Sequence, residues 1–178
     1  MRCGRYAAID IGTVTCRMLV VDVGESGLHE LTREYAITNL GEGVDATGEL
    51  KPEAMERVVR AIDGFLAVRD SLSTPDHPVI RTVAVATSAA RDARNAADFA
   101  ARLRERGIEL SVIPGAREAA LSFSGASIDF LRERLMVVDV GGGSTEVVMG
   151  MGGVEPVCAH SFNVGRRRVT EKFLASDP

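Results

Sequence analysis

Three consecutive glycines between two valine-rich segments constrain this chain more than any other feature of its sequence. The stretch reads Met136-Val137-Val138-Asp139-Val140-Gly141-Gly142-Gly143-Ser144-Thr145-Glu146-Val147-Val148-Met149. We interpret it as two β-strands joined by a tight turn, because β-branched residues favour strands and glycine tolerates the positive φ or close backbone approach that such a turn needs. Unpaired amides in the turn would form a concave site for an anion, and the Ser144 and Thr145 hydroxyls would add donors to it.

The register of this hairpin predicts a pair of carboxylates beside the anion site. If residues 141–144 form the loop, Asp139 lies opposite Glu146 on one face of the hairpin. Two close acids raise each other's pKa unless a cation lies between them, and magnesium commonly bridges carboxylate and phosphate oxygens. The glycines alone are also consistent with an ordinary hairpin that binds nothing.

The same pattern occurs a second time near the N-terminus. There the chain reads Ala7-Ala8-Ile9-Asp10-Ile11-Gly12-Thr13-Val14-Thr15-Cys16-Arg17-Met18-Leu19-Val20-Val21. An apolar run, Asp-x-Gly, hydroxyl residues and a second apolar run recur in the same order, which indicates two similar lobes that face each other. Neither copy contains the Gly-Lys-Ser/Thr of a Walker A loop, so a P-loop NTPase is disfavoured.

Five segments together resemble the exopolyphosphatase / guanosine pentaphosphate phosphohydrolase family. They are residues 7–13, residues 86–93, Gly115 with Glu118-Ala119, residues 139–146, and Gly165 with residues 168–173. Their order and spacing match the family along nearly the whole chain. The family belongs to the actin-like ATPase superfamily, so the resemblance implies an α/β, ribonuclease-H-like fold with a mixed sheet, whose two lobes close on a cleft.

Local patterns along the chain agree with that architecture. The pattern of residues 1–131 predicts the order βββαβαβα of a first lobe. Pro52 begins the first predicted helix, and residues 79–86 form a buried parallel strand. A second helix begins with a capping box at Asn95, and a third ends near Phe130. Residues 132–178 predict only βββα, so we expect an incomplete second lobe and a chain that is part of a longer protein. The turn-rich residues 39–48 are expected to form a mobile loop, either a solvated connector or part of the cleft.

Composition narrows the class of partner. The net charge of −4 argues against nucleic-acid binding, and no apolar run is long enough to cross a membrane. The three cysteines are far apart and lack the C-x-x-C grouping of a zinc site. No secretory signal segment is present at the N-terminus, so a cytoplasmic location is expected. The sequence leaves a homodimer open.

The resemblance assigns a role to each candidate residue. Glu118 corresponds to the family's general base, and Arg91 corresponds to an arginine that would clamp the substrate phosphate. Mg²⁺ and the attacking water would be held by Asp10, Asp139 and Glu146. The phosphate-binding residues would be Gly12, Thr13, Gly142, Gly143, Ser144 and Thr145.

These roles favour a magnesium-dependent phosphohydrolase that removes terminal phosphate from inorganic polyphosphate. Guanosine pentaphosphate is the rival substrate, and a non-catalytic sensor of polyphosphate or nucleotide is the other alternative. A sugar kinase or chaperone-type ATPase is disfavoured because the Glu118 and Arg91 motifs resemble those of the phosphohydrolases. Two residues depart from the family pattern. Val14 replaces a polar residue, and Arg117 replaces an acid. If the side chains of Arg117 and Glu118 met, the positive charge of Arg117 would lower the Glu118 pKa. The cluster at residues 166–168 is interpreted as a receptor for a polyphosphate tail or as a solvated helix face.

Overall fold

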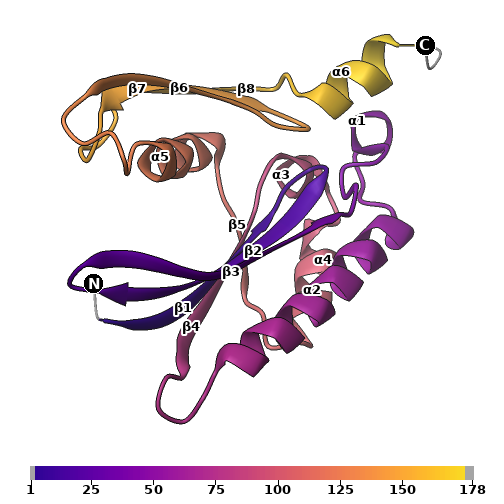
Figure 1. The fold of residues 1–178 in the computed structure, drawn as a ribbon. Coiled ribbons are helices and arrows are strands. Elements are labelled where there is room, and N and C mark those ends of the chain that lie inside the picture. Colours follow the sequence, from indigo (N-terminus) through magenta and orange to yellow (C-terminus); the bar gives the residue numbers. More distant parts are fainter. Residues whose placement is uncertain (1–2, 175–178) are drawn as a thin grey trace.

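The computed structural model describes residues 3–174, and its largest unit is a five-stranded sheet (Figure 1). Its strands are β1 (Gly4–Ile11), β2 (Thr15–Gly24), β3 (Gly27–Ile37), β4 (Val79–Ala86) and β5 (Leu110–Val112). The strand order is β3-β2-β1-β4-β5. Strands β1, β2 and β3 pair antiparallel, whereas β4 is parallel to β1 and β5 is parallel to β4. The predicted meander followed by parallel strands is therefore confirmed.

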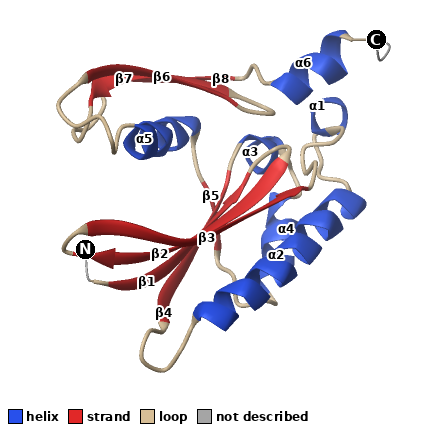
Figure 2. Cartoon of the chain, viewed as in Figure 1, coloured by secondary structure: helices blue, strands red, loops and turns tan. Residues whose placement is uncertain are grey.

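Six helices accompany the strands within residues 3–174 (Figure 2). They are α1 (Val44–Thr47), α2 (Pro52–Leu72), α3 (Ser88–Asp92), α4 (Ala96–Arg104), α5 (Gly115–Ala126) and α6 (Arg166–Phe173). The predicted order βββαβαβα holds from β1 to α5, and the short helices α1 and α3 are additions that the sequence pattern did not predict. Helix α5 ends before the predicted boundary near Phe130. None of these helices combines the length and the apolarity that a membrane span needs.

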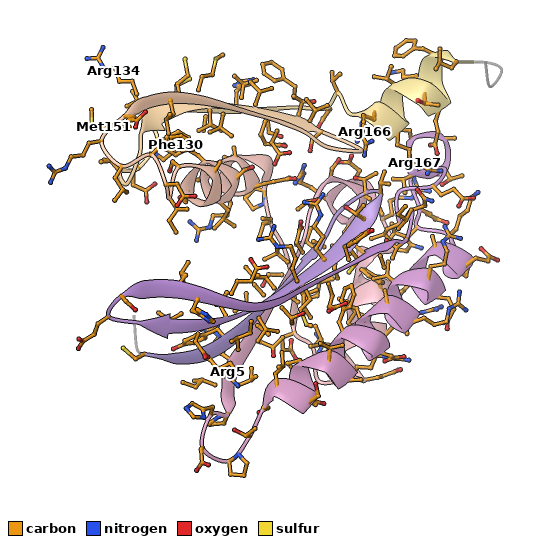
Figure 3. All side chains as sticks on the ribbon, in the orientation of Figure 1. Arg5, Phe130, Arg134, Met151, Arg166 and Arg167 are labelled. Atoms are coloured by element: carbon orange, nitrogen blue, oxygen red, sulfur yellow. The ribbon has the colours of Figure 1, made fainter. Side chains whose placement is uncertain are left out.

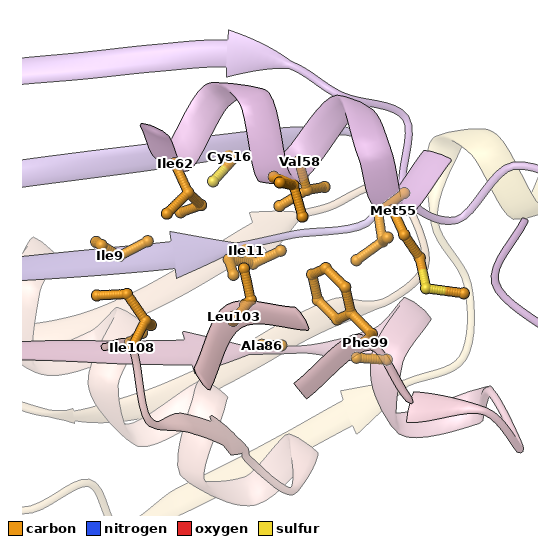
Figure 4. Packing of buried hydrophobic residues seen from close by; sticks show 14 of the residues in the cluster. Ile9, Ile11, Cys16, Met55, Val58, Ile62, Ala86, Phe99, Leu103 and Ile108 are labelled. Atoms are coloured by element: carbon orange, nitrogen blue, oxygen red, sulfur yellow. The ribbon is translucent and has the colours of Figure 1, made fainter. Parts of the chain in front are cut away.

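One face of the five-stranded sheet carries the main hydrophobic core (Figure 4). Alternate residues of a strand point to the same side, so β1 directs both Ile9 and Ile11 into this core. Helix α2 supplies Val58 and Ile62 from its apolar stripe, and α4 supplies Phe99. Burying a side chain of this size stabilises the fold by roughly 1.5–3 kcal/mol. The core therefore fixes the positions from which the turn after β1 and the turn after β4 emerge.

Two local predictions for this part of the chain are wrong. Asn95 does not cap α4 with its side chain, because its carboxamide instead exchanges hydrogen bonds with the Leu50 amide (2.8 Å) and carbonyl (3.0 Å). Residues 39–48 do not form a solvated connector, since Leu40 is fully buried and the Gly41 amide donates to the Thr13 carbonyl at 2.9 Å. In both cases a tertiary contact replaces the local preference of a polar, turn-forming sequence.

A second, antiparallel sheet is formed by β6 (Arg134–Val140), β7 (Thr145–Met151) and β8 (Cys158–Phe162), in that order. The predicted glycine hairpin is β6 with β7. Helix α5 precedes this sheet in the sequence but packs against it, where Ala119 and Phe123 form a second buried cluster with Val148 (Figure 1). We propose, as the sequence predicted, a first lobe of residues 1–131 and an incomplete second lobe of residues 132–178, with α5 lying at their junction.

Candidate active site

The β1–β2 and β6–β7 hairpins have the predicted form. In the β6–β7 hairpin Asp139 pairs with Glu146, so residues 141–144 form the connecting loop. In the β1–β2 hairpin Asp10 pairs with Arg17. Residues paired across two strands share one face of the sheet, so each hairpin presents two charged side chains together next to its turn.

Close contact between the two turns explains two of the three consecutive glycines. A Cβ atom on Gly142 would lie 2.6 Å from the Val14 side chain, and one on Gly143 would lie 2.7 Å from the Thr13 hydroxyl. Neither glycine has a positive φ. Of the two reasons that the sequence left open, close backbone approach is therefore the one that applies.

A cavity of about 110 Å³ lies between the two turns. The predicted site residues that line it are Asp10, Gly12, Thr13, Glu118, Asp139, Gly142, Gly143, Ser144 and Glu146. Within the described residues, the amides of Gly142, Gly143 and Ser144 donate to no backbone carbonyl. Free amides in a turn are the donors that a phosphate group needs, so the geometry suits a phosphate-binding site.

Glu118 reaches this cavity from the first turn of α5, and its side chain is 18% exposed. Burial raises the pKa of the Glu118 carboxyl above that of an ordinary glutamate. The charges of Glu146 and Asp10 raise this pKa further, while the hydrogen bond and the charge of Arg91 lower it. A carboxylate with a raised pKa is a better proton acceptor near neutral pH than a solvated one.

Arg91 contacts Glu118 and does not line the cavity. Its guanidinium donates to the Glu118 carboxylate at 3.1 Å and to the Ile113 carbonyl at 2.9 Å. The predicted clamp on a substrate phosphate stays a prediction, and the observed contacts give Arg91 the role of holding Glu118 in place. Arg117 is exposed and is not among the charges that shift the Glu118 pKa, so its proximity in sequence does not bring the two side chains together.

Serine hydroxyls hold the two carboxylates of the second hairpin. Ser161 donates to Glu146 at 2.7 Å, and Ser122 donates to Asp139 at 2.5 Å. Glu146 is only 1% exposed, and burying its carboxylate costs free energy unless the group is hydrogen-bonded or bound to a cation. The Ser161 hydroxyl and a ligand in the cavity are the partners that can offset this cost.

The carboxylates around the cavity fit a hard divalent cation. Burial raises the pKa of Asp10; the Arg17 charge lowers it, and the Asp139 charge raises it again, so acids from the two hairpins repel each other. Among residues 3–174, no three Asp, Glu, His or Cys side chains lie close enough to hold a metal ion by themselves. Magnesium commonly needs only one or two carboxylates, because phosphate oxygens and water complete its shell. The predicted set of Asp10, Asp139 and Glu146 stays a prediction.

Comparison with known proteins decides the family. Residues 19–178 match the Ppx/GppA phosphatase family. The chain belongs to this family. Exopolyphosphatase 2 of Mycobacterium tuberculosis is 41% identical over 186 aligned positions, which cover 98% of this chain and 56% of that protein. The bifunctional 3-dehydroquinate synthase/phosphatase of Fusobacterium nucleatum is 34% identical over 96% of this chain and 26% of that protein.

Crystal structures of Ppx/GppA proteins have the same fold. An exopolyphosphatase from Cytophaga hutchinsonii matches with a TM-score of 0.88 at 31% identity, covering 98% of this chain and 55% of that one. The Aquifex aeolicus family member matches with a TM-score of 0.78 at 31% identity, covering 99% of this chain and 56% of that one. The ribonuclease-H-like, actin-like ATPase fold is thereby confirmed. This chain spans about half the length of most of the relatives it matches.

Two arginines outside the predicted set of site residues line the cavity of this Ppx/GppA chain. Arg17 lies opposite Asp10 on β2, and Arg166 is the first residue of α6. The register argument that paired Asp139 with Glu146 would also have found Arg17, because the same pairing rule holds in the first hairpin. Arg166 belongs to the basic cluster at residues 166–168, for which the sequence left a polyphosphate receptor and a solvated helix face open, and its place at the cavity depends on where α6 packs.

Thr145 and the remaining arginines of the cluster bind other groups of the protein. The Thr145 hydroxyl donates to the Val164 carbonyl, and Thr145 does not line the cavity. Arg167 forms an ion pair with Glu171 at 2.7 Å, and Arg168 is held by two ion pairs. Figure 3 shows Arg166 and Arg167 at the start of α6, beside the end of the β6–β7 hairpin. Arg167 and Arg168 are therefore held by groups of the protein, whereas Arg166 is exposed and lines the cavity, so a role for Arg166 in receiving a polyphosphate tail stays a prediction.

Proposed function

We propose that this chain carries the phosphate-binding and catalytic part of an exopolyphosphatase, which releases terminal phosphate from inorganic polyphosphate. One observation carries the proposal: Glu118, with a raised pKa, lines the same cavity as the free amides of the glycine turn. Support also comes from two of the relatives described above, which are named exopolyphosphatases.

In the proposed reaction, each group around the cavity has one task. The turn amides and the Thr13 and Ser144 side chains bind the oxygens of the terminal phosphate, which places its phosphorus opposite Glu118. As the water oxygen bonds to the terminal phosphorus, the Glu118 carboxylate accepts a proton from that water, and Arg91 keeps the carboxylate oriented. The bond between the terminal phosphorus and the bridging oxygen breaks, and the shortened polyphosphate leaves with that oxygen as an anion. Asp10, Asp139 and Glu146 would hold Mg²⁺, which supplies positive charge to neutralise the phosphate oxygens.

The test compares two matched glutamates in an assay of phosphate release from long-chain polyphosphate with magnesium chloride. Glu118→Gln keeps the size and polarity of the side chain but removes the proton acceptor, so release should fall by about 10²–10⁴-fold. Glu53→Gln is the control, because Glu53 also lies in the first turn of a helix but is exposed on α2. Equal release by the wild type and Glu118→Gln would refute the role of Glu118.

A non-catalytic sensor is the outcome that the same assay separates from the enzyme. Tight binding of polyphosphate by the wild-type chain without any phosphate release, in this chain and in a form with a complete second lobe, would replace the hydrolase by a sensor. The complete form is needed because closure of both lobes is expected to exclude bulk water from the reacting phosphate.

Guanosine pentaphosphate is the alternative substrate, and one further cavity favours it. A cavity of about 390 Å³ adjoins the phosphate site, shares Asp10 and Arg17 with it, and is otherwise mostly apolar, with Leu19, Val83 and Leu121 in its lining. Apolar walls of this kind suit a nucleoside better than a polyphosphate chain, which is charged along its whole length. Leu121→Asp should lower the affinity for guanosine pentaphosphate but not for tripolyphosphate, and equal effects on both would remove this alternative.

A further inference from the structure

Helix α6 binds the outward-facing carbonyls of the glycine turn. Three consecutive carbonyls accept hydrogen bonds from its first turn. The contacts are the Gly141 carbonyl with the Arg166 amide (3.0 Å), the Gly142 carbonyl with the amides of Arg167 (2.9 Å) and Arg168 (3.2 Å), and the Gly143 carbonyl with Arg168 Nε (2.8 Å). The free amides at the helix N-terminus and one side chain thus hold the whole back of the turn.

These contacts determine where the amides of the turn point. In a trans peptide the carbonyl of one residue and the amide of the next point in opposite directions. A carbonyl held by α6 therefore turns the following amide away from α6. The amides concerned are those of Gly142, Gly143 and Ser144, which are the free donors of the phosphate site.

The first hairpin is supported in the same way. The Thr13 carbonyl accepts from the Gly41 amide at 2.9 Å, and the Val14 carbonyl accepts from the amides of Thr38 and Asn39, each at 2.9 Å. In both phosphate turns, carbonyls are therefore occupied from behind by the chain segment that follows the third strand, β3 for the first turn and β8 for the second. Unoccupied carbonyls would leave the turn peptides free to rotate, whereas occupied ones keep the amides oriented before a ligand arrives.

Arg168 differs from all other groups in these two supports. Among residues 3–174 it is the one side chain that donates to a carbonyl of either turn, at Gly143. Its other guanidinium nitrogens donate to Asp45, Asp92 and Ser88, which belong to α1 and α3 of the first lobe. Its side chain is 18% exposed, so these contacts are partly shielded from water. Arg168 thus ties the Gly143–Ser144 peptide to the opposite lobe.

We propose that Arg168 is a positioning residue of the phosphate site, which aims the Ser144 amide at the terminal phosphate by holding the Gly143 carbonyl. This inference rests on the proposed function, because it deepens the account of how that site binds phosphate. Arg168 does not line the phosphate cavity, and each of its three guanidinium nitrogens donates to a group of the protein, so its proposed action on the substrate is indirect.

The test uses sodium tripolyphosphate as the probe and two matched arginines of α6. Arg168→Ala removes the contact to the Gly143 carbonyl. Arg167→Ala also removes a contact between the lobes, to Asn39, but leaves the three turn carbonyls occupied. Arg168→Lys keeps the positive charge near Asp45 and Asp92 while losing the planar fork that reaches Gly143 at the same time. Affinity is measured by titration calorimetry, and ¹H–¹⁵N spectra report the Ser144 amide directly.

Arg168→Ala and Arg168→Lys should each weaken tripolyphosphate binding by about tenfold, since one oriented, charge-assisted contact is lost. Both should also shift the Ser144 amide resonance in the free protein, whereas Arg167→Ala should leave affinity and that resonance near the wild-type values. Equal losses in Arg168→Ala and Arg167→Ala, or full affinity in Arg168→Lys, would overturn the inference. If the wild-type chain does not bind tripolyphosphate, the proposed function itself fails, and this inference fails with it.

Discussion

Gly165→Ala is the substitution with which the support of the phosphate turn is most directly probed. Gly165 is buried and immediately precedes α6. An added Cβ would lie 2.4 Å from the Gly142 carbonyl carbon and oxygen and 2.5 Å from the Gly143 nitrogen. All three atoms belong to the backbone, so no side-chain rotation can relieve the contact. The φ of Gly165 is −141°, which alanine adopts without strain, so the effect is purely steric.

The overlap sets the size of the expected effect. The contact would be about 1 Å shorter than an ordinary one, so the start of α6 must move away from the turn. Overpacking of this kind destabilises a protein by about 1–3 kcal/mol. Moving α6 also lengthens the hydrogen bonds to the turn carbonyls, so the affinity for tripolyphosphate should fall together with the free energy of unfolding.

Urea unfolding and calorimetric titration with tripolyphosphate measure both effects. Gly64→Ala is the matched control, because Gly64 lies within α2 and its added Cβ would meet nothing within 4 Å. The control should stabilise the chain by up to about 1 kcal/mol, as alanine is a better helix former than glycine, and should leave binding unchanged. Wild-type stability and affinity in Gly165→Ala would refute the close approach of α6 to the turn.

Three further predictions concern groups at or near the site. Asp10→Asn should make the chain more stable at pH 7, because burial raises the Asp10 pKa, so the carboxylate is destabilising above that pKa. The gain should shrink as the pH falls toward the ordinary aspartate value, and urea unfolding at several pH values checks this; a gain that grows at low pH would contradict it. Burial raises the pKa of the Cys16 thiol to about 12, so a thiol reagent at pH 8 should modify exposed Cys3 and Cys158 but not Cys16 in the folded chain, as peptide mass spectrometry would show. Phe123→Ala should lower the free energy of unfolding by about 3–5 kcal/mol, because Phe123 is fully buried between α5 and the second sheet; a loss below about 1 kcal/mol in urea unfolding would contradict that packing.

The sequence predicted the parts of this structure that depend on short-range periodicity. The side-chain period of a strand is two, so a loop at residues 141–144 sufficed to pair Asp139 with Glu146, as observed. The antiparallel meander and the parallel strand β4 were also predicted, from alternating and continuous apolar runs, whereas the complete strand order of the sheet was not. The resemblance to a family added Glu118, whose proposed role as a base no local pattern would have indicated.

Contacts between segments that are distant in sequence could not be predicted. Asn95 is of a residue type that commonly caps helices, yet its side chain forms hydrogen bonds with the Leu50 backbone. Tertiary folding brings Leu50 close, and its backbone groups replace the amides of the first turn of α4 as partners of the Asn95 side chain. Arg168 begins a segment that resembles the family, but its contacts could not be predicted, since its partners lie on α1, on α3 and in the glycine turn. The order of helices and strands along the chain likewise did not predict that α5 packs on the second sheet.

The position of α5 between the two sheets affects how Glu118 would be oriented in the proposed hydrolysis. Glu118 lies on helix α5, which is packed against the second sheet, whereas Arg91 belongs to α3, next to the first sheet. Their 3.1 Å ion pair therefore joins a helix packed on the second sheet to a helix next to the first sheet. If the two sheets moved apart in the way that domains of enzymes open around their ligands, Glu118 would separate from Arg91. The proposed orientation of Glu118 by Arg91 would then exist only in the closed form, and the proposed hydrolysis would stop while phosphate leaves and a new polyphosphate end enters.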